Sequence, residues 1–210
     1  MITIVDYGVG NVQALLNMFE YLGVEAESSH SANVIADAKG IILPGVGSFD
    51  RAMNSLQQLS IIQGLEYAVL ERKIPVLGIC LGMQIMARRS AEGELPGLCW
   101  LDADVRRIAI PESSGLKIPH MGWNKIQTTR PSQLFEGADT NKRFYFVHSY
   151  HMMCDDVKDV LATTDYGEKI CCAINKENIW GVQFHPEKSH RYGMNLLESF
   201  ASLTQSITAK

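Results

Sequence analysis

Two separated stretches of the chain contain the residue types of a cysteine-based acyl-transfer centre. Cys80 stands in the run 78–84, Gly-Ile-Cys-Leu-Gly-Met-Gln, and far downstream the chain passes through His185-Pro186-Glu187. A thiolate can attack an acyl carbon, an imidazole can move the proton, and a carboxylate can orient the imidazole. Because such triads are recognised by roles and not by chain order, the two stretches predict one centre made of Cys80, His185 and Glu187.

The residues around Cys80 predict a nucleophile elbow, a sharp turn between a strand and a helix. The apolar run 74–79 has the character of a buried strand, and it leads into a Gly-x-Cys-x-Gly pattern. Glycines allow the backbone to turn sharply and let neighbouring chain come close. At such a turn the thiol lies at the N-terminus of a helix, whose partial positive charge favours the thiolate.

The second stretch predicts a histidine held by a carboxylate. The run 181–184, Gly-Val-Gln-Phe, is typical of a strand end, and residues two apart in extended chain share a face. His185 and Glu187 are therefore expected to point the same way, with Pro186 restricting the backbone of His185 to extended geometry. A lone cysteine is usually a small buried hydrophobe. The combination of both stretches at strand ends, where α/β sheets carry their sites, favours a functional centre.

The elements that position these residues are predicted from hydrophobic periodicity. Strand-like runs occur at 2–6, 41–43, 75–79, 144–147 and 179–184. A helical pattern begins at Val12 and ends before Gly23, and a second follows Pro44-Gly45-Val46-Gly47 and continues toward 70 as another helix. Alternating strands and helices predict an α/β fold with a mostly parallel central sheet and helices on both faces.

The second half of the chain has a different rhythm. Between about 98 and 180 the pattern is one of shorter extended segments, including 101–108 and 160–164, and a closing helix places Leu196, Leu197 and Phe200 inward. These segments predict a mixed or antiparallel extension of the sheet. We expect one domain that spans 1–210.

Composition excludes several classes of function. The chain has 210 residues and a formal net charge of −4, so there is no electrostatic argument for nucleic acid or an anionic membrane as partner. The pair Arg88-Arg89 is interpreted as a solvated helix end. Neither a basic leader nor an apolar run of membrane-spanning length occurs, which favours a cytosolic protein.

No cofactor or metal is predicted. The five cysteines include no C-x-x-C pair, which argues against a zinc site or a disulfide framework. His148 and His151 are three residues apart, but no third ligand is near them in the sequence. Gly8-Val9-Gly10 follows the first strand, yet Gln13 replaces the third glycine of the dinucleotide-binding fingerprint.

The run 78–84 together with 185–187 resembles the class I glutamine amidotransferases. Four further stretches, at 6–11, 44–47, 119–124 and 146–150, resemble the glutaminase subunits of imidazole glycerol phosphate synthases of histidine biosynthesis, and they cover nearly the whole chain. The resemblance implies that Cys80 attacks the side-chain amide of L-glutamine and forms a γ-glutamyl thioester with release of ammonia. His185 would move the protons in both halves of the reaction, and water would release glutamate.

The resemblance also implies further site residues. The backbone N–H of Leu81 is the expected oxyanion donor at the elbow. A second donor is expected from Val46 or Gly47, in a glycine-containing segment that could exist in an inactive and an active arrangement. Residues expected to hold the α-carboxylate and α-ammonium of glutamine are Gln84, Glu92, His148, Ser149 and Tyr150, with Glu94 competing for the role of Glu92.

Free ammonia would be lost to solvent, so a synthase partner is expected. In the family this partner is a (β/α)₈-barrel cyclase that forms a heterodimer with the glutaminase. The predicted docking residues are Asn11, Met121, Trp123, Tyr145 and Lys188. Trp and Tyr are common interface anchors, although either is also a common core residue.

Three alternatives fit the same residues. The chain could be a paralogous glutaminase that supplies ammonia to another synthase, for example one that amidinates a sugar. It could be a catalytically silent subunit that only binds a partner, although such a subunit has no physical need for all three triad residues. A γ-glutamyl peptidase would need no ammonia-accepting partner and would turn over strongly alone.

Overall fold

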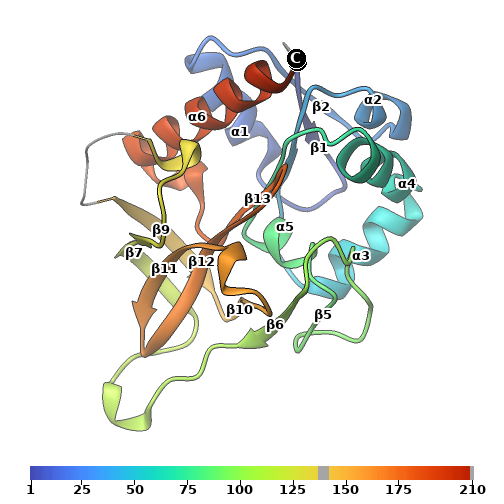
Figure 1. The fold of residues 1–210 in the computed structure, drawn as a ribbon. Coiled ribbons are helices and arrows are strands. Elements are labelled where there is room, and N and C mark those ends of the chain that lie inside the picture. Colours follow the sequence, from blue (N-terminus) through green and yellow to red (C-terminus); the bar gives the residue numbers. More distant parts are fainter. Residues whose placement is uncertain (137–141, 209–210) are drawn as a thin grey trace.

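The central sheet begins with five parallel strands. A computed structural model describes residues 1–136 and 142–208, and Figure 1 shows their arrangement. The parallel strands run in the order β2-β1-β3-β4-β13. Their bounds are β1 (Ile2–Val5), β2 (Ala26–Ser29), β3 (Gly40–Leu43), β4 (Val76–Ile79) and β13 (Ile179–Val182). This part confirms the predicted parallel sheet.

The sheet continues beyond β13 mainly through antiparallel pairs. The order is β13-β12-β10-β6-β5, in which only β5 and β6 are parallel, and β11 branches from β12 to reach β8. These strands are β5 (Arg89–Ser90), β6 (Ala103–Arg107), β8 (Gln127–Thr128), β10 (Tyr150–Cys154), β11 (Val160–Tyr166) and β12 (Glu168–Lys176). The predicted antiparallel extension is thereby confirmed.

A separate ribbon of two strands lies beside the extension. Strands β7 (His120–Lys125) and β9 (Arg143–His148) pair antiparallel, with His120 opposite His148 and Trp123 opposite Tyr145. In Figure 1 this ribbon lies next to β11 and β12, at the end of the molecule away from α2 and α4. The ribbon therefore brings residues 120–125 and 143–148 together next to the carboxyl end of β13.

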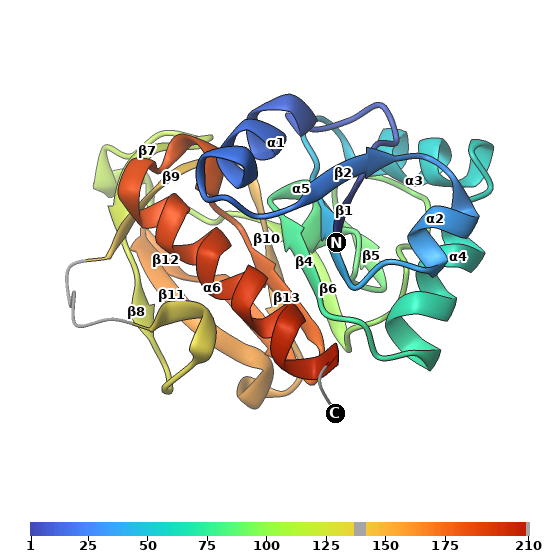
Figure 2. The same cartoon turned by 90° about the horizontal axis from the view of Figure 1, so that it is seen from above.

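Helices cover both faces of the sheet. The helices α1 (Val12–Tyr21) and α6 (His190–Thr208) contact each other and pack on one face (Figure 2). On the other face are α2 (Ala32–Ala36), α3 (Phe49–Gln58), α4 (Ile62–Glu66) and α5 (Leu81–Gln84). A π-helical turn (Tyr67–Glu71) follows α4, and 3₁₀ turns occupy Glu112–Ser114, Gln133–Phe135, Val157–Asp159 and Pro186–Lys188.

Side-chain alternation along the strands divides the core between the two faces. Ile41 and Leu43 of β3 lie in the core under α2, α3 and α4, whereas Ile42 lies in the core under α1 and α6. Successive strand residues point to opposite faces, so a strand buried on both sides is mostly apolar along its whole length. All four residues of β1, β3, β4 and β13 are buried accordingly.

One local interpretation from the sequence is wrong. Arg88 and Arg89 are not at a helix end: Arg89 belongs to β5 and Arg88 precedes it. Arg88 pairs with Asp104 at 2.9 Å and with Asp155 at 2.7 Å, and Arg89 pairs with Asp104 at 2.9 Å. These contacts join segments that are distant in sequence, which a local pattern does not reveal. Among the described residues, no helix is both long and apolar enough to cross a membrane.

Candidate active site

Cys80 occupies a strained turn between β4 and α5. Its backbone has φ of 54° and ψ of −109°, in a region that L-residues rarely adopt. The flanking glycines permit the close packing of this turn. A Cβ on Gly82 would lie 1.7 Å from the carbonyl oxygen of Leu43, and one on Gly78 would lie 2.7 Å from the carbonyl oxygen of Gly82. The turn is the predicted elbow, and it places the thiol at the carboxyl end of the parallel strands.

His185 and Glu187 are hydrogen-bonded to each other, and His185 lines the same cavity as the Cys80 thiol. Their Nδ1 and Oε1 atoms are 2.7 Å apart, and both side chains are almost fully buried. The sequence argument for this pair was wrong in one detail, because Pro186–Lys188 forms a 3₁₀ turn and is not extended chain. The turn is braced by Ser189, whose hydroxyl donates to the carbonyl of His185 at 2.6 Å and accepts from the backbone N–H of Tyr145 at 3.0 Å.

The surroundings of His185 favour its protonated form. Burial alone would lower the pKa of the imidazole, but its interactions with Cys80 and Glu187 outweigh burial and raise the pKa from 6.5 to about 10. Nε2 of His185 makes no hydrogen bond within ordinary limits in this conformation. Catalytic hydrogen bonds are often long before substrate binds. The arrangement therefore suits an imidazole that holds its proton beside the Cys80 sulfur.

One cavity contains most of the predicted site residues. It has a volume of about 500 Å³, within the usual range for small-molecule sites. Its lining is Val46, Gly47, Cys80, Leu81, Gln84, Glu92, Pro119, Val147, His148, Ser149, Tyr150, His185 and Lys188. The fold thus brings together the predicted nucleophile, base, oxyanion and substrate-binding positions. Glu92 lines the cavity and Glu94 does not.

The cavity wall formed by residues 148–150 contains a second buried histidine, His148. His148 Nδ1 donates to the carbonyl oxygen of Tyr150 at 2.9 Å, and Gln84 Nε2 donates to the same oxygen at 2.9 Å. Burial lowers the pKa of His148 to about 3, because no carboxylate lies beside it to compensate. This wall is therefore held by a neutral imidazole.

The predicted oxyanion donors are arranged around a glycine-containing segment. The Leu81 N–H donates to the carbonyl oxygen of Gly45 at 3.3 Å, so this donor is occupied in the described conformation. The buried hydroxyl of Tyr7 donates to the carbonyl oxygen of Pro44 at 2.5 Å. Gly47 has φ of 110°, and a Cβ there would meet nothing within 4 Å. The first half of the segment is thus fastened by hydrogen bonds, whereas open space surrounds the Cβ position of Gly47.

Glu92 has a structural contact in addition to its place in the cavity. Its Oε2 accepts a hydrogen bond of 2.9 Å from the backbone N–H of Phe49, the first residue of α3. A carboxylate at a helix N-terminus is favoured by the helix dipole. The carboxylate thereby links the loop that follows β5 to the segment that carries Gly47.

The predicted docking residues lie mainly on one side of the β7–β9 ribbon. Met121 and Trp123 are 60% and 44% exposed, and the rings of Trp123 and Tyr145 are 6.4 Å apart. Lys188 is exposed, with its Nζ 5.7 Å from the centre of the Tyr145 ring. Asn11 is exposed too, and its side chain accepts from the N–H of Ala14 as the N-cap of α1.

Sequence reasoning missed Gln183. This side chain is fully buried and donates from Nε2 to the Cys80 sulfur at 3.6 Å, while its Oε1 accepts from Gln84 Nε2 at 2.9 Å. The signal was available, because Gln183 is two residues before His185 and is a polar residue in an otherwise apolar strand end. His120 was also given no role, although it lies within one of the quoted stretches.

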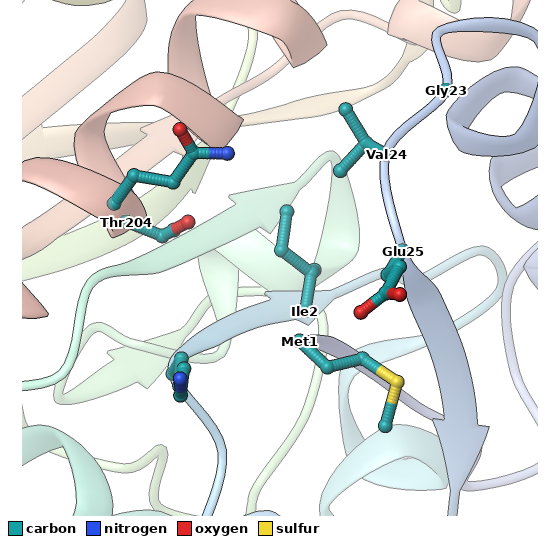
Figure 3. Close-up of a pocket in the computed structure, with 8 residues that line it drawn as sticks. Met1, Ile2, Gly23, Val24, Glu25 and Thr204 are labelled. Carbon is teal, nitrogen blue, oxygen red and sulfur yellow. The ribbon is translucent and has the colours of Figure 1, made fainter.

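A larger cavity lies at the opposite edge of the sheet and lacks such chemistry. Figure 3 shows this cavity of about 550 Å³ beside the N-terminal ends of β1 and β3. Its lining is Met1, Ile2, Gly23, Val24, Glu25, Lys39, Thr204 and Gln205, with neither cysteine nor histidine among them. In parallel sheets functional sites lie at the carboxyl ends of the strands, which agrees with the position of Cys80. Within residues 1–136 and 142–208, no three His, Cys, Asp or Glu side chains are grouped as metal ligands.

Comparison with known proteins identifies relatives over nearly the full length. A family model described as "Glutamine amidotransferase class-I" matches residues 3–202. The imidazole glycerol phosphate synthase subunit HisH of Bdellovibrio bacteriovorus is 47% identical over 204 residues, covering 97% of this chain and all of the relative. The subunit HisH 2 of Methanococcus maripaludis is 46% identical over 200 residues, covering 95% and 98%.

A solved structure supports the fold. The crystal structure of a glutamine amidotransferase from Thermotoga maritima has a TM-score of 0.65 and covers 100% of this chain and 85% of its own. Its sequence identity is only 16%, so it bears on the fold alone.

Proposed function

The chain belongs to the class I glutamine amidotransferases, and we propose that it is the glutaminase subunit of an imidazole glycerol phosphate synthase. It would hydrolyse L-glutamine to L-glutamate and ammonia, and would deliver the ammonia to a (β/α)₈-barrel cyclase in a cytosolic heterodimer. Full-length relatives named as this subunit support the proposal. The observation that carries the chemistry is a single cavity that holds a thiol, a carboxylate-paired imidazole and several polar groups for a small amino acid.

The first half of the reaction forms the thioester. The Cys80 thiolate attacks the side-chain carbonyl carbon of glutamine, and the carbonyl oxygen becomes an oxyanion. When this tetrahedral intermediate collapses, the C–N bond breaks and His185 gives its proton to the departing nitrogen, which leaves as ammonia. The raised pKa of His185 means that the imidazole holds this proton at neutral pH.

The second half regenerates the enzyme. Neutral His185 now takes a proton from water, and the resulting hydroxide attacks the γ-glutamyl thioester. Collapse breaks the C–S bond, releases glutamate and restores the thiolate beside the imidazolium. Glu187 holds the imidazole by accepting from Nδ1 throughout.

The oxyanion site supplies a means of regulation. The Leu81 N–H is engaged by the carbonyl of Gly45, and the glycine at position 47 allows the neighbouring peptide to reorient. Turning the peptide of Val46 and Gly47 would present a second donor to the oxyanion. The loss of one such donor typically costs ~10²–10³ in rate, which is enough to keep the isolated subunit nearly inactive.

Glutamine would be held by polar groups on the cavity walls. Glu92 is suited to the α-ammonium, since one of its oxygens is used by Phe49 and the other remains available for a second partner. The α-carboxylate would meet backbone and side-chain groups of four other lining residues, Gln84, His148, Ser149 and Tyr150. The partner would dock on Met121, Trp123, Tyr145 and Lys188, with Asn11 at the start of α1.

The test is glutaminase activity of the chain alone and with the cyclase encoded in the same genome, with and without the nucleotide that the cyclase binds. We expect weak activity alone, a large increase with the liganded cyclase, and none in Cys80→Ala. Synthesis from added ammonium should persist in Cys80→Ala, because only the ammonia supply is removed. Full glutamine-dependent synthesis by Cys80→Ala would favour a catalytically silent binding protein, and high activity without a partner would favour the peptidase.

A second candidate is a paralogous glutaminase that supplies another synthase. The relative from Methanococcus maripaludis is named subunit HisH 2. The active-site residues of such a paralogue would be the same. Complementation of a histidine auxotroph that lacks its glutaminase subunit distinguishes the two: growth supports histidine biosynthesis, and a failure to grow despite glutaminase activity supports the paralogue.

A further inference from the structure

A chain of hydrogen bonds leads from the inner side of β7 to the cavity wall. Asn124 Nδ2 lies 3.3 Å from His120 Nε2, His120 Nδ1 lies 2.9 Å from His148 Nε2, and His148 Nδ1 lies 2.9 Å from the carbonyl oxygen of Tyr150. His120 and His148 are almost fully buried. We refer to Asn124, His120, His148 and the Tyr150 carbonyl as the histidine relay.

The hydrogen-bond pattern allows only one tautomer at each ring. The Tyr150 carbonyl can only accept, so His148 must carry its proton on Nδ1, and Nε2 of the neutral ring must accept from His120. His120 therefore donates from Nδ1 and accepts at Nε2. Asn124 is the matching donor, and its orientation is independently fixed: Nδ2 also donates to the Asp165 carbonyl, and Oδ1 accepts from the Lys125 N–H.

Packing holds the His120 ring in place. The imidazole stacks on Phe146, with ring centres 4.6 Å apart and planes at 21°, and on Tyr166, with ring centres 4.0 Å apart and planes at 24°. Burial also lowers the pKa of His120 to about 4, which agrees with a neutral ring. The ring thus has a fixed plane, a fixed tautomer and one polar contact toward the cavity.

The relay continues toward the nucleophile. The Tyr150 carbonyl also accepts from Gln84 Nε2, which donates in turn to Gln183 Oε1, and Gln183 Nε2 donates to the Cys80 sulfur. A shift of His148 would therefore displace a carbonyl that positions Gln84. On the opposite side of β7, the alternating residues Met121 and Trp123 are exposed. One strand thus carries an exposed apolar surface on one side and the relay on the other.

We propose that His120 is a positioning residue, which fixes the tautomer and orientation of His148 and thereby the glutamine-binding wall formed by Ser149 and Tyr150. The inference rests on the proposed function, since it takes glutamine as the ligand of this cavity. It does not give His120 contact with substrate. The relay further predicts that a partner seated on Met121 and Trp123 can change the affinity for glutamine through β7.

The first measurement determines the tautomers of His120 and His148 in the wild-type protein. In the full chain labelled with ¹⁵N-histidine, long-range ¹⁵N–¹H spectra distinguish Nδ1–H from Nε2–H tautomers. We expect both His120 and His148 to be neutral Nδ1–H tautomers from pH 8 to about 5. Spectra of His120→Asn and His148→Asn provide the assignments. An Nε2–H tautomer or a protonated ring at His148 in this range would overturn the relay.

The second measurement is the protection of Cys80 by L-glutamine against iodoacetamide, followed by peptide mass spectrometry. His120→Phe keeps an aromatic ring between Phe146 and Tyr166 but leaves Nε2 of His148 unpaired. We expect the glutamine concentration for half-protection to rise about tenfold, the usual effect of one lost buried hydrogen bond. His120→Asn retains a nitrogen donor at the Nδ1 position, and it should stay within about threefold of wild type.

Tyr166→Phe is the matched control, because it keeps the stacked ring and loses only the hydroxyl contact with the Lys117 carbonyl. Tyr166→Phe should leave both the histidine tautomers and the glutamine concentration for half-protection unchanged. Unchanged half-protection in His120→Phe, or equal losses in His120→Phe and His120→Asn, would overturn the positioning role. If glutamine fails to protect wild-type Cys80 while the Nδ1–H tautomers are observed, the proposed function fails and the relay stands.

Discussion

Two buried histidines face the same cavity, and their surroundings give them opposite charges. His185 lies between the Cys80 thiol and the Glu187 carboxylate, and its pKa is raised to about 10. His148 lies between another imidazole and a carbonyl, and its pKa is lowered to about 3. Both side chains are more than 90% buried, so burial alone does not separate them.

The difference between the two histidines lies in their partners. The carboxylate beside His185 favours the charged form of its imidazole. The Tyr150 carbonyl and the neutral His120 ring beside His148 offer one acceptor and one donor, and at this histidine the effect of burial outweighs the hydrogen bond to the carbonyl. The His185 side of the cavity is therefore built to hold and move a proton. The His148 side is built to keep one hydrogen-bonding geometry. The following predictions use substitutions that should affect one side and not the other.

The largest expected effect is that of His185→Asn. Without the imidazole no group can protonate the departing nitrogen or activate water, so kcat for glutamine hydrolysis should fall by ~10⁴-fold or more. The measurement is steady-state glutaminase activity of the complex with its cyclase. His148→Asn is the matched variant: it retains a donor toward Tyr150, and its main effect should be on KM. A fall in kcat of less than tenfold in His185→Asn would remove His185 from the mechanism.

Glu187→Gln should make the surroundings of His185 less favourable to its protonated form. We expect kcat to fall by about 10²-fold or more, because a weaker acceptor remains to hold the imidazolium. The pKa of His185 should move down from about 10 toward its ordinary value. A histidine with a raised pKa contributes stability that is fully present below pH 6.5 and is lost as pH rises through 10.

Urea unfolding between pH 7 and 10 checks this second expectation. Wild type should lose stability across that interval, and Glu187→Gln should lose less of it. His148→Asn serves as control, since it should retain the wild-type pH dependence above pH 7. If the two curves of wild type and Glu187→Gln run parallel, the carboxylate does not set the charge of His185.

Gln183→Leu should slow the chemistry of the thiol by a smaller amount. A hydrogen bond to a charged group contributes about 1.5–3 kcal/mol. The bond from Gln183 to the Cys80 sulfur is long, so its contribution should lie at the lower end of this range. We therefore expect alkylation of Cys80 by iodoacetamide at neutral pH to slow by about tenfold. The exposed Cys99 in the same molecule is an internal control whose rate should not change. An unchanged rate at Cys80 would show that Gln183 only holds Gln84.

The smallest expected effect concerns stability in mild acid. His120 and His148 have lowered pKa values, so between pH 6.5 and about 4 the unfolded chain binds protons that the folded chain excludes. Stability should therefore fall as pH falls through this interval. Removing one such histidine in His120→Phe should reduce the slope by about 1.4 kcal/mol per pH unit. Urea unfolding at several pH values measures this slope, and equal slopes would mean that folding does not lower the pKa of His120.

Much of the fold was predictable because it depends on local patterns. Short apolar runs such as 76–79, which follows Pro75, favour strands buried on both faces, and the periodic residues of 12–21 form an amphipathic helix that ends before Gly23. The Gly-x-Cys-x-Gly spacing likewise predicted the elbow, since only small residues fit beside the turn at Cys80. In such cases covalent geometry and residue size decide the outcome within a few positions.

Other features were decided by the tertiary structure. The sequence by itself determined the strand and the elbow at Cys80, because strand, turn and nucleophile are adjacent in the chain, and it predicted the triad from residue types in two separated stretches. Only the fold decided that Gln183 reaches the Cys80 sulfur, that Glu92 and not Glu94 lines the cavity, and that His120 meets His148. The physical reason is that the charge and the hydrogen bonds of a side chain depend on neighbours from distant segments. The sequence gives the identity of these neighbours but not their position in space.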